Sequence, residues 1–121
     1  MNIWFAAASA LSVLWLGVHL FIGGREVAAP LRNSDLPPLV RDTQWLCWHY
    51  TTMAIGVMAA IFGLAAWSGE TAYALSGLML AVGFAVFGIV LAPLVGAPYR
   101  RVPQGWLFVP VVALGVLGLL S

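Results

Sequence analysis

The chain has 121 residues, of which 63% are hydrophobic and only 7% are charged, and its formal net charge is +1. Soluble domains carry about 25% charged residues, and a soluble fold this small exposes too much surface to cover so many apolar side chains. The composition therefore excludes an ordinary soluble domain and predicts an all-α membrane protein whose first partner is the lipid bilayer. Its basic residues are five arginines without a basic stripe, which also excludes nucleic-acid binding.

Four apolar segments follow one another along the chain, at residues 3–23, 44–67, 71–94 and 104–120. About 20 apolar residues cross the hydrocarbon core as a helix, and a helix satisfies its own backbone hydrogen bonds there. We therefore predict a single polytopic domain, residues 1–121, with four transmembrane helices in an up-down bundle. The first segment lacks the basic region of a cleavable signal peptide, so we expect it to be retained.

The connections between these segments differ in charge. All five arginines fall in the first and third connections, residues 24–43 and 96–103, while the second connection and both termini have none. Arginine-rich loops remain in the cytoplasm, so we expect both termini on the outer side, which would be the periplasm for a bacterial inner membrane. Three prolines in residues 24–43 predict that no long helix crosses the first connection.

Two histidines flank the first connection at matched depth. His19 lies four residues before Gly23, where the first apolar segment ends, and His49 lies four residues after Trp45, where the second begins. At about 1.5 Å per residue, both imidazoles would lie about 6 Å inside the same membrane face. Ionisable side chains at membrane depth are costly and mark candidate functional sites.

One hypothesis from these histidines is a haem or metal site, and hence a membrane redox protein. Two facing imidazoles can supply both axial ligands of a haem iron, or ligands for another metal. In this hypothesis His19 and His49 are the ligands, Arg25 and Arg41 pair with the propionates, and Trp48 lines the cofactor. The pattern is weak, because each helix carries only one histidine.

Two other interpretations of the same residues stay open. His19, His49, Trp48, Tyr50 and Thr52 could form a pocket for a quinone-like or lipid substrate at the cytoplasmic interface, which would make the protein an enzyme or a carrier. Alternatively, the histidines only hydrogen-bond a neighbouring helix or the loop. The single cysteine, Cys47, is predicted to be a small buried apolar residue.

The third and fourth segments are rich in glycine, which lets helices approach closely in lipid. The glycines concerned are Gly77, Gly83, Gly88, Gly115 and Gly118. They make an accessory or assembly subunit, or a homo-oligomer, our first expectation for the function. The redox and lipophilic-substrate hypotheses remain as alternatives, and the sequence identifies neither the ligand, the partner nor a reaction.

Overall fold

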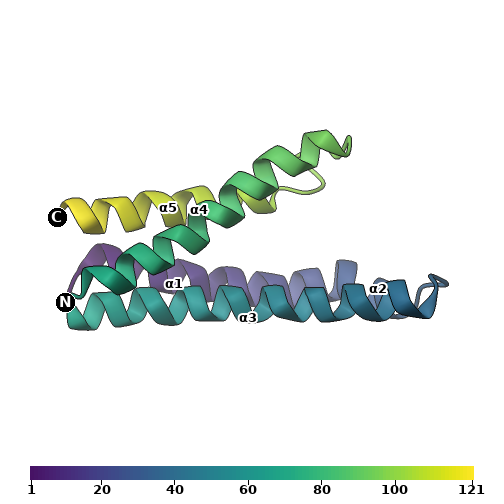
Figure 1. Cartoon of the computed structure of the whole chain (residues 1–121), viewed down its shortest axis with the longest axis horizontal. Helices are drawn as coiled ribbons and strands as arrows, with labels where there is room; N and C mark the ends of the chain where they lie inside the picture. The colour runs from purple at the N-terminus through teal and green to yellow at the C-terminus, as the bar shows by residue number, and fades with distance from the viewer.

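The computed structural model describes all 121 residues and contains helices and no strands (Figure 1). The first helical rod is continuous and consists of three elements, α1 (Ile3–Gly17), the π-helical segment η1 (Val18–Ala28) and α2 (Ala29–Arg32). Three further helices follow, α3 (Pro38–Ser68), α4 (Thr71–Leu94) and α5 (Gln104–Leu120).

Three of these helical rods are long and apolar enough to cross a membrane, namely Ile3–Arg32, Pro38–Ser68 and Thr71–Leu94. The fourth, Gln104–Leu120, is a shorter apolar helix. At the rise of an α-helix, a rod of 30 residues would be about 45 Å long, compared with about 30 Å for a hydrocarbon core. The first two rods are therefore longer than crossing a bilayer requires.

The first connection is shorter than the sequence predicts. The helix of the first rod continues to Arg32 and α3 already begins at Pro38, which leaves only residues 33–37 between them. As the three prolines predict, no long helix crosses the whole connection, but Pro30 itself does not end the helix of the first rod. The N–H of Ala29 still bonds back to the carbonyl of Gly24 in the π register, and Pro30 then stands in the first turn of α2, where a missing N–H is tolerated. The predicted segments 71–94 and 104–120 match α4 and α5.

Small side chains occupy the interior of the fold. Only 20 of the 121 residues are buried, and alanine is the commonest residue among them. The largest fully buried side chain is Phe62 of α3, whose ring lies against Gly77 of α4 and Gly115 of α5. Many larger apolar side chains, such as Met79 and Phe87, point outward. This distribution is typical of helices that pack in lipid.

The closest approach between two helices is the crossing of α4 and α5. A Cβ atom added at Gly88 would lie 2.5 Å from the Cα of Gly105, so the two backbones are in direct contact. Glycine is the only residue that fits at this crossing.

Asn2 joins three helix ends. Its side-chain oxygen accepts hydrogen bonds from the first N–H groups of α1, its backbone N–H donates to the carbonyl of Ala66 at 3.1 Å, and its Nδ2 donates to the carbonyl of Gly118 at 3.0 Å. The two termini and the α3–α4 connection therefore lie at one end of the molecule. Residues 33–37 and the α4–α5 connection lie at the other end, on the right of Figure 1. We name the second of these ends the arginine end, because all five arginines lie toward it.

Substitution of Gly88 tests the crossing of α4 and α5. Gly88→Ala should lower the free energy of unfolding by about 1–3 kcal/mol, because the added methyl group forces two backbones apart. Gly83→Ala in the same helix is the matched control, since a Cβ there has no neighbour within 4 Å. Thermal unfolding of both variants in detergent measures the difference. Equal unfolding temperatures for the two variants would contradict the described crossing.

Candidate ligand-binding groove

An open groove of about 600 Å³ lies between the first rod and α3, and its lining comes from η1, the start of α2 and the first half of α3, toward the arginine end. Most of its lining is apolar, and it contains one guanidinium group, one imidazole and two indoles. The lining residues are Leu20, Phe21, Ile22, Gly24, Arg25, Ala28, Ala29, Trp45, Trp48 and His49.

The π-helical segment η1 forms one wall of the groove. Its hydrogen bonds run from residue i to residue i+5, a register that is rare and occurs frequently at functional sites. Three small residues on this side of the groove, Gly24 and Ala28 of η1 and Ala29 of α2, leave room next to α3. The groove therefore exists because the helix is locally unwound and carries little side-chain volume where it faces α3.

Trp48 forms part of the opposite wall and is held from two directions. Its ring stacks on the imidazole of His19, with ring centroids 4.1 Å apart and planes inclined by 17°. The far edge of the indole fills the space beside Gly23, where an added Cβ would lie 2.7 Å from the ring. Trp48 therefore cannot swing across to close the groove without losing both contacts.

His19 is committed to a hydrogen-bond network between the first rod and α3. Its Nε2 lies 2.9 Å from Oγ1 of Thr52 and 3.3 Å from the carbonyl oxygen of Trp48. The Thr52 hydroxyl donates to that same carbonyl at 3.2 Å. Since a carbonyl only accepts, this network assigns the ring proton to Nε2, which donates to Thr52.

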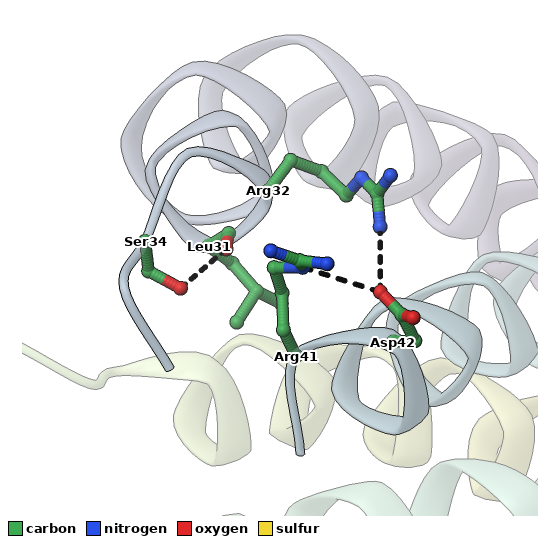
Figure 2. Close-up of polar contacts among 5 residues, drawn as sticks. All are labelled: Leu31, Arg32, Ser34, Arg41 and Asp42. Carbon is green, nitrogen blue, oxygen red and sulfur yellow. Dashed lines mark hydrogen bonds and ion pairs between the residues drawn. The ribbon is translucent and has the colours of Figure 1, made fainter. Parts of the chain in front are cut away.

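Trp45 lies at the arginine end of the groove and is held by Arg32 and His49. The guanidinium of Arg32 lies 5.3 Å from the centre of its ring, and the ring of His49 packs against it in a T-shaped arrangement at a centroid distance of 4.6 Å. Arg32 also forms an ion pair with Asp42 at 3.1 Å, and Arg41 pairs with the same carboxylate at 3.2 Å (Figure 2). Exposed ion pairs contribute little stability, so we interpret the cluster chiefly as positioning Trp45.

The structure brings some of the predicted site residues together and separates others. Arg25, Trp48 and His49 line the groove, while His19 packs behind Trp48 and does not. Arg41 is paired with Asp42 outside the groove. Cys47 is exposed, so its predicted burial is wrong, because it lies on the face of α3 away from the first rod.

Sequence reasoning missed the residues that shape the groove. In the sequence Gly23 marks only the end of the first apolar segment, whereas in the structure Gly23 accommodates Trp48 and the adjacent Gly24 leaves part of the groove open. The cation–π contact between Arg32 and Trp45 was also not predicted. A tryptophan at the same membrane depth as a glycine pair is the signal that points to the first of these contacts.

A site shared by both histidines would require rearrangement. His19 would have to release Nε2 from Thr52 before that nitrogen could bind a metal, and only His49 lines the groove. No group of three or more His, Cys, Asp or Glu side chains lies close enough to hold a metal ion. The present geometry thus offers one imidazole to a ligand in the groove.

Comparison with models of protein families, with characterised proteins and with solved structures finds no match to this chain. The proposals for its function therefore depend on the geometry of the groove.

The hydrogen bond between His19 and Thr52 can be measured with a double-mutant cycle. The variants His19→Phe, Thr52→Val and their combination should give a coupling free energy of about 0.6 kcal/mol, the usual size for such bonds between membrane helices. Reversible unfolding in mixed micelles provides the measurement. Strictly additive single effects would show that the two side chains do not interact.

Proposed function

We propose that this protein binds a lipophilic small molecule, of the quinone or lipid type, with the polar end of the molecule in the groove between η1 and α3. The observation that carries the proposal is a mostly apolar groove whose lining also includes the guanidinium of Arg25 and the imidazole of His49. Its volume of about 600 Å³ falls within the range of small-molecule sites. The groove is the place where the chain combines apolar walls with a cation and an imidazole.

The second groove on the molecule provides a useful contrast. It has about 650 Å³, lies between α3 and α4 and is lined by apolar side chains together with Ser76 and Gly83. The Ser76 hydroxyl donates to the carbonyl of Ala72, so it is already satisfied. The second groove has no charged side chain and no free polar group in its lining. We therefore favour the first groove as the ligand site.

We further propose a bacterial inner membrane as the location, with both termini in the periplasm. The support is that all five arginines lie toward one end of the molecule, which would then face the cytoplasm. In this orientation the groove opens near the cytoplasmic interface. A lipophilic molecule could enter from the bilayer and present its polar end to the cytoplasm.

Binding is the activity that the lining supports, and it would be the first step of a carrier as well as of an enzyme. An enzyme would depend on His49, since imidazole is the side chain that most often serves as a general acid or base.

An accessory subunit or homo-oligomer is the second candidate. Five glycines in the third and fourth apolar segments favour this candidate in the sequence. Four of them already contact other parts of the same chain and are therefore not free to contact a partner, namely Gly77, Gly88, Gly115 and Gly118. Gly83 alone has open space around it, in the groove between α3 and α4. Of the surfaces around these five glycines, only the face of α4 around Gly83 therefore stays open for contact with another protein.

The proposed orientation is tested with single cysteines in a Cys47→Ser background. Ser121→Cys should react with a membrane-impermeant thiol reagent in intact cells, because it lies at the end without arginines. Asn33→Cys should react only after permeabilisation. The reverse pattern would refute the orientation.

Closing the groove with a side chain tests the binding function. Gly24→Leu should lower the amount of co-purified lipophilic molecule by about tenfold or more, because the added side chain occupies the ligand volume. Gly17→Leu is the matched control, since both glycines have no neighbour within 4 Å and Gly17 lies outside the groove. Solvent extraction followed by mass spectrometry gives the amounts.

Three outcomes would contradict the proposed binding function. If both leucine variants retained the wild-type amount of every extracted molecule, the groove would not be the binding site. A Soret absorbance band that His49→Ala removes would instead identify the haem hypothesis as correct. A stoichiometric protein partner without any bound small molecule would favour the accessory subunit.

A further inference from the structure

We infer that the polar end of the ligand is an anion, a carboxylate or phosphate on an alkyl chain, and that Arg25 binds it. This inference rests on the proposed binding function and specifies the class of molecule. It follows from the hydrogen-bonding capacity, the charge and the shape of the groove.

The polar side chains of the groove offer mainly donors. The structure shows no hydrogen bond within the chain from the side chains of Arg25, Trp45, Trp48 or His49, in contrast to the indole of Trp15, which donates to the carbonyl of Leu107 at 2.7 Å. Guanidinium and indole groups donate and do not accept. A ligand whose polar end only accepts hydrogen bonds complements this lining.

The charge of Arg25 is not balanced within the chain. Arg32 and Arg41 share the carboxylate of Asp42, whereas no carboxylate lies within 4 Å of the Arg25 guanidinium. Glu26 follows it in sequence but forms no ion pair with it and does not line the groove. Arg25 is exposed, so an anion beside it would supply the missing countercharge through charge-assisted hydrogen bonds.

The apolar wall extends from Arg25 in one direction. Leu20, Phe21 and Ile22 precede it along η1, farther from the arginine end, and Phe21 is 75% exposed. An anionic head at Arg25 therefore leaves its alkyl chain lying along these side chains, toward the middle of the bilayer. A cationic amphiphile would meet the guanidinium with like charge.

Matched ten-carbon probes test the inference on the full-length protein in nanodiscs of zwitterionic phosphatidylcholine. Decanoate, decyl phosphate, decanol and decyltrimethylammonium share an alkyl chain and differ in the head group. Calorimetric titration at mildly alkaline pH, corrected with empty nanodiscs, should show both anions binding at least about tenfold more tightly than decanol, a difference of about 1.4 kcal/mol. The cation should show no saturable binding.

The variant Arg25→Gln should bring both anions to the affinity of decanol and leave decanol itself unchanged. Arg100→Gln is the matched control, because it removes the same charge from the same end of the molecule, outside the groove. It should retain the preference for anions. Unchanged decanol binding also shows that the Arg25 variant is folded.

The outcomes separate the inference from the function on which it rests. Equal affinities for decanol and the anions, or an anion preference that survives Arg25→Gln, would overturn the inference while the lipophilic-ligand function stands. If Arg100→Gln also lost the preference for anions, that preference would come from the general positive charge at this end of the protein. This result would overturn the inference too. The absence of saturable binding for every probe would overturn the proposed function itself. Tighter binding of decanoate supports the inference with a fatty acid as the source, and tighter binding of decyl phosphate supports it with a phospholipid.

Discussion

The packing of Phe62 against two glycines is the contact on which the arrangement of the helices depends. Its ring is fully buried and contacts the backbone positions of Gly77 and Gly115, so α3, α4 and α5 meet at one point. In a chain that is 63% hydrophobic, polarity cannot decide which apolar side chains turn inward. Side-chain size decides instead, because alanine and glycine allow the contact distances that give helices in lipid their packing energy.

The groove also results from the size of the side chains between the helices. Where α1 faces α3, the interface is filled by buried residues such as Ala8, Ile55 and Met58. Farther along the first rod, small residues of η1 meet no side chain large enough to fill the space, since His19 and Gly23 hold Trp48 in place. The result is an unfilled region beside an uncompensated guanidinium, which is why we interpret it as a binding site and not as incomplete packing.

The sequence predicted the helices well where hydrophobicity alone determines them. The segments 71–94 and 104–120 correspond to α4 and α5, because short polar connections limit both. Residues 24–43 were predicted as a loop, yet most of them are helical. The three prolines predict that no long helix crosses this connection, but the π register ends just before Pro30 and the first turn of α2 accommodates that residue.

The candidate site could be predicted only in part. The matched depth of the two histidines points to the interface between the first rod and α3, where Arg25, Trp48 and His49 line the groove, and their binding of a ligand stays a prediction. The directions in which the side chains of η1 point depend on its π-helical register. A sequence prediction that assumes α-helical periodicity does not describe this register. His19 consequently hydrogen-bonds Thr52, while His49 alone reaches the groove.

Photo-crosslinking in living cells tests the central claim, that a lipophilic molecule occupies the groove between η1 and α3, most directly. Cells would be fed a fatty acid that carries a photoreactive diazirine and an alkyne, illuminated, and the crosslinked peptides of this protein mapped by mass spectrometry. The account predicts that crosslinks concentrate on residues 20–29 and 45–49. Crosslinks spread evenly over the lipid-facing surfaces, or concentrated on α4 between Ser76 and Phe87, would contradict it.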